Sequence, residues 1–286
     1  MITTLSTGLA TAELAHVDAP NGVSYAYRRF GTRSSAVPIV FLQHFRGNVD
    51  NWDPALVDGV AAHREVIVFD NAGVGASTGT TPDTIEQMAI DALAFLDALG
   101  LAQVDLFGFS LGGFVAQEIA LEAPGRVRRL VLAGTGPKGA PGMEGWSPDV
   151  IEGVVVDDNT PEGYLGVFYT GSAQSLGAGK ASAGRIFARQ EGRDEWPSLE
   201  TKDAQYRAVE NWGVQDWTAV RRLTGITQPT LVLQGDHDVM IPTKASHLMA
   251  ALIPDAQIHI YPDASHGSIF QYAGEAAART VAFLAN

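Results

Sequence analysis

Short apolar runs alternate with longer segments of helical spacing along most of this chain. Four runs are apolar on both faces and two more follow late in the chain, so strands are predicted at 38–42, 66–69, 104–107, 130–132, 230–233 and 257–261. Continuous apolar runs of this length are typical of parallel strands in the middle of a sheet, because helices cover both faces of such strands.

The clearest helical segment between these runs extends from Pro82 to Leu99. One stripe of it holds the apolar residues Ile85, Met88, Ala89, Ala92, Leu96 and Leu99. Pro82 suits the first helical position and Gly100 suits the end of the helix. Alternation of strands and helices predicts an α/β fold, with a mostly parallel sheet, right-handed crossovers and flanking helices.

Two parts of the chain depart from this alternation. Residues 1–15 are expected to form a loose arm, followed by a hairpin over 16–27 whose turn is Pro20-Asn21-Gly22. Residues 138–224 have short helical patches without strands, and they contain four of the five tryptophans. We therefore expect a core domain made of 1–137 and 225–286, with 138–224 inserted as a helical cap.

Composition narrows the range of functions. The chain has 286 residues, of which 46% are hydrophobic, a formal net charge of −13 and no cysteine. The negative charge argues against nucleic-acid binding, and the lack of cysteine excludes disulfides and thiolate chemistry. No apolar stretch reaches the length of a membrane span, and no signal peptide is visible, so a cytoplasmic protein is expected. No metal-ligand cluster is apparent, and the oligomeric state stays open.

The candidate chemistry begins at Gly108-Phe109-Ser110-Leu111-Gly112-Gly113, between a predicted strand and a predicted helix. Gly-x-Ser-x-Gly in this context indicates a tight, strained turn that exposes the serine hydroxyl beside the positive end of a helix. The alternative is a glycine-rich turn that only allows helix and strand to pack closely.

A serine hydroxyl needs a general base to act as a nucleophile, normally a histidine oriented by a carboxylate. Asp236-His237-Asp238 follows one late strand, and His266 follows the next. Both loops leave the carboxyl ends of their strands, as Ser110 does, and those ends form the ligand crevice of an open parallel sheet. Either Asp236 or Asp238 could orient the histidine.

These segments resemble the α/β-hydrolase superfamily over nearly the whole chain apart from the cap. Residues 69–77 are similar to its Asp-x-x-Gly-x-Gly-x-Ser loop, and the stretch around Asp238 is similar to its acid loop. The resemblance implies an α/β-hydrolase fold and the chain order nucleophile, acid, histidine, which gives Ser110, Asp238 and His266. It places Asp236 in a turn or capping role.

The resemblance also implies an oxyanion hole made by the backbone N–H of Leu111 and a second N–H from the loop after residues 39–42. Relatives carry His-Gly-x there, whereas this chain has Gln43-His44-Phe45-Arg46. Phe45 is the expected donor, with Arg46 as its rival.

Four further side chains are candidate substrate contacts. His44 and Arg46 could favour a polar or anionic substrate group, or they could tie down their own loop. Trp146 and Trp212 of the cap could line an apolar pocket, or they could form the core of the cap.

We therefore expect a serine hydrolase that cleaves a small carboxylic ester or lactone without a cofactor. A serine nucleophile forms an acyl-enzyme, which suits esters, lactones, thioesters or activated amides. Two alternatives stay open. One is a cofactor-free perhydrolase, of the kind called non-haem haloperoxidase, and the other is a ligand-binding receptor or regulator that retains the triad.

Overall fold

One eight-stranded sheet organises the computed structural model, which describes residues 8–33, 37–157 and 160–285. The strand order is β1-β2-β4-β3-β5-β6-β7-β8. β2 pairs antiparallel with both β1 and β4, and all other neighbouring strands pair parallel. The strands are β1 (Ala15–Asp18), β2 (Ser24–Gly31), β3 (Ile39–Leu42), β4 (Glu65–Phe69), β5 (Val104–Phe109), β6 (Val127–Ala133), β7 (Thr230–Gly235) and β8 (Ala256–Tyr261).

The six predicted parallel strands and the predicted hairpin are confirmed, with one difference in burial. Every residue of β3, β4, β5 and β7 is buried, as continuous apolar runs indicate. β8 is instead an edge strand, and its residues Gln257 and Ile258 are exposed. Adjacent residues of a strand point to opposite faces, so this part of the edge strand is open to solvent on both faces.

The helices outside the 138–224 segment are α1 (Pro54–Ala61), α2 (Ile85–Ala98), α3 (Leu111–Glu122), α9 (Thr243–Leu252), α10 (Ser268–Gln271) and α11 (Ala273–Ala285). The connection from β3 to β4 runs in the opposite direction across the sheet from the connections β4 to β5 and β5 to β6. Right-handed crossovers therefore put α1 on one face and α2 and α3 on the other. Consistent with this arrangement, α1 packs against α11, and α2 packs against α3.

The start of α2 differs from the prediction. The helix begins at Ile85, and Thr84 caps it by accepting a hydrogen bond from the Gln87 N–H. A threonine oxygen satisfies a free helix N–H that a proline ring cannot, so the cap lies after Pro82. Gly100 ends the helix as expected, with a φ of 67°.

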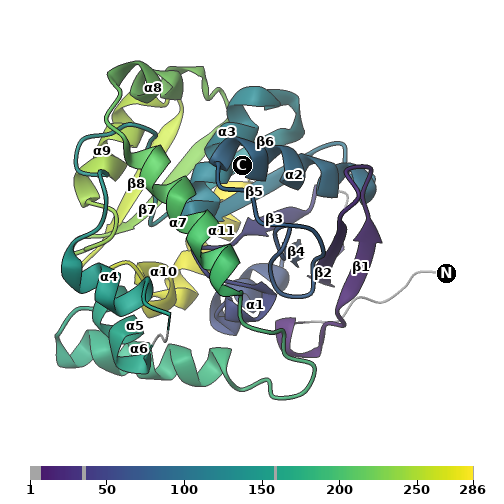
Figure 1. Cartoon of the computed structure of the whole chain (residues 1–286), viewed down its shortest axis with the longest axis horizontal. Coiled ribbons are helices and arrows are strands. Elements are labelled where there is room, and N and C mark those ends of the chain that lie inside the picture. The colour runs from purple at the N-terminus through teal and green to yellow at the C-terminus, as the bar shows by residue number, and fades with distance from the viewer. Residues whose placement is uncertain (1–7, 34–36, 158–159, 286) are drawn as a thin grey trace.

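Between β6 and β7 the described chain contains helices but no strand: α4 (Pro148–Val154), α5 (Pro161–Phe168), α6 (Ala173–Ile186), α7 (Leu199–Gly213) and α8 (Trp217–Arg221). Figure 1 shows α4, α5 and α6 gathered at one corner of the molecule, beside α10.

The described chain also contains short 3-10 helices. They are η1 (Leu9–Thr11), η2 (Val49–Asn51), η3 (Pro124–Arg126) and η4 (Arg222–Gly225).

The described part of the N-terminal arm is not loose. Leu9 is buried, and the guanidinium groups of Arg189 and Arg28 donate to the carbonyls of Leu9 and Ala12. These contacts anchor the segment to the core and to the stretch after α6. Residues 1–7 of the predicted arm lie outside the described residues.

A buried carboxyl group connects β4 to the segment after α6. Asp70 directly follows β4, and its Oδ1 accepts a hydrogen bond of 2.8 Å from the Val49 N–H. The carboxyl group of Asp194 lies close to that of Asp70, and both border Gly75. A Cβ added to Gly75 would lie 2.3 Å from Asp194 Oδ2 and 2.7 Å from Asp70 Oδ2. Burial, and then the hydrogen bond and charge of Asp194, raise the pKa of Asp70 well above its ordinary value.

This environment makes the stability depend on pH. Above about pH 4 the unfolded chain loses the Asp70 proton while the folded state keeps it, so the free energy of unfolding falls as pH rises through that window. We expect Asp70→Asn to remove this loss, at up to about 1.4 kcal/mol per pH unit. Urea unfolding at pH 5 and pH 8 measures the effect, with the exposed Asp255→Asn as the control. A constant difference between Asp70→Asn and the wild type at both pH values would contradict it.

Candidate active site

Ser110 lies at a strained turn between β5 and α3. Its φ of 55° is in the left-handed region that residues with a side chain rarely adopt. Backbone contacts hold it there: its N–H donates to the Ala133 carbonyl at 2.9 Å, and its carbonyl accepts from the Gly113 N–H and the Thr135 hydroxyl. The neighbouring strand β6 and the loop after it therefore stabilise the conformation.

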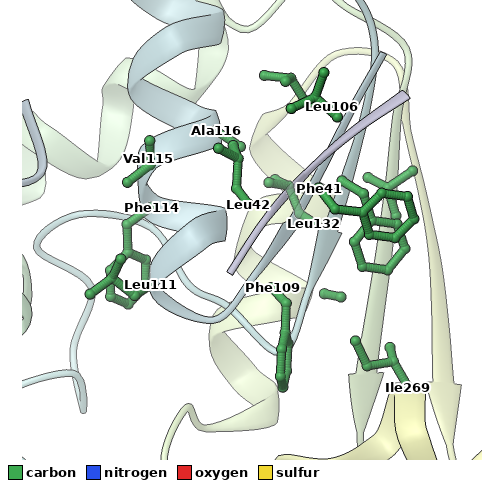
Figure 2. Close-up of a cluster of buried hydrophobic side chains, with 14 of the residues drawn as sticks. Phe41, Leu42, Leu106, Phe109, Leu111, Phe114, Val115, Ala116, Leu132 and Ile269 are labelled. Atoms are coloured by element: carbon green, nitrogen blue, oxygen red, sulfur yellow. The ribbon is translucent and has the colours of Figure 1, made fainter. Parts of the chain in front are cut away.

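The glycines around this serine let α3 start directly against the sheet. A Cβ on Gly112 would lie 2.0 Å from the Leu42 carbonyl oxygen, and one on Gly108 would lie 2.5 Å from the Gly112 oxygen. Figure 2 shows the turn with Phe109 and Leu111 on its two sides and Leu42 close to α3. The close approach of helix and strand and the position of Ser110 at the apex of the turn thus depend on the same glycines.

An imidazole lies beside this serine. His266 Nε2 is 2.9 Å from Ser110 Oγ, and His266 Nδ1 is 2.9 Å from Asp238 Oδ2. Because a carboxylate only accepts, Nδ1 carries the proton and Nε2 offers its lone pair to the serine hydroxyl. All three side chains are buried.

Asp238, rather than Asp236, makes this contact. The other oxygen of Asp238 accepts from the N–H groups of Met240 and Ile241, and the Gln234 amide donates to Oδ2. Asp236 Oδ1 instead bonds the His237 ring and accepts from the Ala264 N–H. Asp236 therefore holds the histidine loop, while Asp238 orients the histidine.

Rings and backbone contacts fix the position of His266. Its imidazole stacks on Phe109, with ring centroids 5.1 Å apart, and meets the edge of Phe168 at 5.3 Å. Phe168 ends α5, and its carbonyl accepts from the Gly267 N–H at 2.7 Å, while the Ser265 hydroxyl donates to the Val167 carbonyl at 2.7 Å. The helical segment after β6 thus contacts the histidine loop directly.

The loop after β3 supplies the remaining candidate groups. Among the described residues, the backbone N–H groups of Phe45 and Leu111 have no hydrogen-bond partner. The Arg46 N–H donates instead to Gln205 Oε1 at 2.7 Å. Phe45 therefore has the available N–H in this loop, and its rival Arg46 does not.

Arg46 and Trp212 are not placed as substrate contacts. The Arg46 guanidinium donates to the carbonyls of Val154 and Val156 and so ties the loop to the end of α4. Trp212 is buried, stacks on Phe114 at 4.9 Å and donates to the Gly136 carbonyl. Side chains that bind backbone carbonyls in this way are already engaged in the fold.

His44 is part of the candidate oxyanion loop, and Trp146 packs against it. The Trp146 ring packs on Phe45, with centroids 5.4 Å apart. The His44 ring contacts Phe109 and Phe168, the two rings that also contact His266. Burial, with a smaller contribution from His266, lowers the pKa of His44 to about 4, so this imidazole is neutral at physiological pH.

Sequence reasoning missed Gln205, Gln234 and Thr135. Gln205 lies in the helical insertion, where no motif marks individual residues. Gln234 directly follows the predicted strand 230–233. A polar residue at the end of an apolar run is a signal that the sequence offered. Such a residue indicates a buried hydrogen bond, which here helps to hold the Asp238 carboxylate.

Searches of the described residues found neither a helix long and apolar enough to cross a membrane nor a group of three metal-binding side chains. A sequence profile for the alpha/beta hydrolase fold matches residues 37–272. The chain is 30% identical over 267 residues to a non-heme haloperoxidase of Rhodococcus erythropolis, covering 88% of this chain and 92% of that protein.

Two further similarities support the same grouping. A pimeloyl-(acyl-carrier protein) methyl ester esterase of Proteus mirabilis is 27% identical over 83% of this chain and 88% of its own length. The structure of an alpha/beta hydrolase fold protein from Chitinophaga pinensis superposes with a TM-score of 0.90 at 38% identity. This match covers 96% of this chain and 98% of that one.

The close packing at the serine turn predicts the effect of a single methyl group. Gly112→Ala would push α3 away from the β3 backbone, and we expect it to lower the free energy of unfolding by more than about 3 kcal/mol. Gly184→Ala, at an exposed position of α6 with nothing within 4 Å, is the matched control and should gain about 0.5–1 kcal/mol. Chemical denaturation measures both variants, and equal effects would refute the packing argument.

Proposed function

Because this chain belongs to the alpha/beta hydrolase fold family, we propose that it cleaves a carboxylic ester or lactone through an acyl-enzyme on Ser110. The observation that carries the proposal is the pair of 2.9 Å hydrogen bonds that join Ser110, His266 and Asp238. A serine needs such a base to act as a nucleophile, and the base needs such a carboxylate to hold its tautomer.

In the proposed mechanism, Ser110 Oγ attacks the scissile carbonyl carbon while His266 Nε2 takes its proton. The N–H groups of Phe45 and Leu111 donate to the oxyanion of the tetrahedral intermediate, assisted by the positive end of α3. The carbon–oxygen bond to the leaving group then breaks, and His266 returns the proton to that oxygen. Water then attacks the acyl carbon while His266 takes its proton. The bond to Ser110 Oγ breaks, His266 returns the proton to Ser110, and the acid is released.

Residues 138–224 act in this proposal as a cap on a core made of 1–137 and 225–286. The closed state of the site supports a cap that moves, because Ser110 is 2% exposed and His266 is 1% exposed. Phe168 packs on the imidazole, and Trp146 packs on Phe45. A small substrate with an apolar part would take the place of some of these ring contacts.

Perhydrolysis is the second candidate function. The relative from Rhodococcus erythropolis is named a non-heme haloperoxidase and covers 88% of this chain. In that reaction hydrogen peroxide, instead of water, attacks the acyl-enzyme and releases a peracid. Comparing peracid with acid formation from one ester at several peroxide concentrations separates the two functions.

A fluorophosphonate tests whether Ser110 is activated. We expect intact-mass measurement to find one adduct on the wild type and none on Ser110→Ala, because only a serine with a general base reacts readily. Ser182, which is buried and donates to Asp53, provides a control variant, Ser182→Ala, that should keep the adduct. An adduct on Ser110→Ala would refute the proposed nucleophile.

Turnover distinguishes an enzyme from a receptor or regulator with the same residues. Clear ester or lactone hydrolysis that Ser110→Ala abolishes would support the enzyme. Hydrolysis near background in a wild type that still binds a ligand would support the receptor.

The two aspartates of one loop provide an internal comparison. We expect Asp238→Asn to lower kcat by about 10³–10⁴-fold, because the amide would stabilise the wrong tautomer of His266. Asp236→Asn should change kcat by less than about tenfold, because its carboxylate bonds the His237 ring and the Ala264 N–H and contacts neither Ser110 nor His266. Steady-state kinetics on one ester measures both variants, and a larger loss in Asp236→Asn would reverse the assignment.

A further inference from the structure

Asp263 connects the loop that carries His266 to the segment between α5 and α6. Thr170 Oγ1 donates to Asp263 Oδ1 at 2.6 Å, and Ser172 Oγ donates to Asp263 Oδ2 at 2.5 Å. Hydrogen bonds from Ser172, and then from Thr170, lower the pKa of Asp263, so its carboxylate is ionised at neutral pH. Hydrogen bonds to a charged acceptor are among the stronger ones in proteins, so this contact joins the two segments firmly.

Further bonds close a ring around this contact. Ser175 Oγ donates to Gln271 Oε1 at 2.6 Å, and Gln271 Nε2 donates to the Asp263 carbonyl at 2.8 Å. The Thr170 N–H donates to Ser175 Oγ at 2.9 Å, which completes the ring. Gln271 ends α10, which lies beside α6 (Figure 1). We call Thr170, Ser172, Ser175, Asp263 and Gln271 the latch.

The latch holds a strained residue at the start of the histidine loop. Asp263 has a φ of 47°, in the left-handed region that residues with a side chain rarely adopt. Such a conformation persists where the surrounding contacts hold it, and here both the carboxylate and the carbonyl of Asp263 are bonded. His266 follows three residues later, so the backbone of Asp263 sets the direction in which the loop approaches Ser110.

The end of α5 also holds the residues on both sides of His266. The Ser265 hydroxyl donates to the Val167 carbonyl, and the Gly267 N–H donates to the Phe168 carbonyl, each at 2.7 Å. These bonds add to those of the latch. A displacement of about 1 Å at the reacting atoms can cost about 10²-fold in rate, so contacts that fix this loop matter to the base itself.

We propose that Asp263 is a positioning residue for His266, and that the segment between α5 and α6 sets the place of the base through it. The inference rests on the proposed serine hydrolase, and it gives the helical insertion a part in catalysis besides covering the site. The base stands 2.9 Å from Ser110 Oγ only while the latch is closed. A movement of α5 and α6 away from the histidine loop would open the latch, so the covering helices and the base take their places together.

The structure contains a matched contact away from the histidine loop. Ser182 of α6 donates to Asp53 Oδ2 at 2.7 Å, and Asp53 caps the N-terminus of α1. This bond has the same chemistry as the bond between Ser172 and Asp263, and it also joins the insertion to the core. If the latch only attached the insertion to the core, loss of either bond would have the same effect on turnover.

Kinetics on one ester test the positioning role. We expect a double variant, Thr170→Val with Ser172→Ala, to lower kcat by about 10–100-fold while KM changes by less than about threefold, because Asp263 loses both hydroxyl partners. Thr170→Ser keeps a hydroxyl group and should retain at least about half of the wild-type kcat, and Ser182→Ala should stay within about twofold of the wild type. Melting temperatures report whether each variant is folded.

A spectroscopic signature tests the position of the base without any substrate. The Nδ1 proton of His266 lies in the bond to Asp238, and a proton of this kind gives a resonance far downfield in the NMR spectrum. His266→Ala identifies the resonance by its loss. We expect it to shift or broaden in the double variant and to stay unchanged in Ser182→Ala, because only the double variant releases the histidine loop.

The outcomes separate this inference from the proposed function. No hydrolysis that depends on Ser110 would overturn the proposed function, and an unchanged resonance in the double variant would then overturn the positioning role as well. Hydrolysis that depends on Ser110, with equal losses of kcat in the double variant and in Ser182→Ala or with no loss in either, would overturn the positioning role alone. If the double variant does not fold, Thr170→Val is compared with Thr170→Ser, and an equal kcat in these two would leave Asp263 without a positioning role.

Discussion

The hydrogen bond between His266 and Ser110 is the contact on which the proposed chemistry depends. It joins residues 156 positions apart in the chain, and no local pattern could bring them together. The parallel sheet does so, because Ser110 follows β5, Asp238 follows β7 and His266 follows β8, all at the carboxyl ends of their strands. The order of the strands in the sheet therefore brings residues that are far apart in the chain to one site.

Helices of the 138–224 segment hold that site from the other side. Thr170 and Ser172 donate to the Asp263 carboxylate, and the Ser175 hydroxyl donates to Gln271. With the bonds from Ser265 and Gly267 to Val167 and Phe168, these contacts attach the end of α5 and the start of α6 to the histidine loop. The position of His266 is therefore coupled to the position of the helices that cover it.

The candidate oxyanion loop shows how side chains can replace a glycine-based turn. Where the family resemblance leads one to expect His-Gly, this chain has Gln43-His44, and the buried Gln43 binds the His44 N–H and the Asn48 carbonyl. His44 Nδ1 also bonds the Phe45 carbonyl, and Gln205 Oε1 accepts from the Arg46 N–H. These bonds fix the loop without a glycine at position 44.

The sequence alone determined the strands, the main helix, the strained serine turn and the order of the candidate groups. Each of these follows from local features, such as an apolar run or glycines around a serine, that act within a few residues. The residue types alone left Asp236 and Asp238 open, and only the resemblance to the α/β-hydrolase superfamily favoured Asp238 and Phe45. Each pair lies on one loop, so the directions of the side chains or N–H groups decide between its members.

The tertiary structure supplies the contacts that distinguish these residues. It engaged the Arg46 N–H with Gln205, placed Trp212 in the core and left β8 at the edge of the sheet. The physical reason is the same in each case. Hydrogen-bond partners and burial depend on segments far apart in the chain, and their relative positions exist only once the sheet and the covering helices have packed.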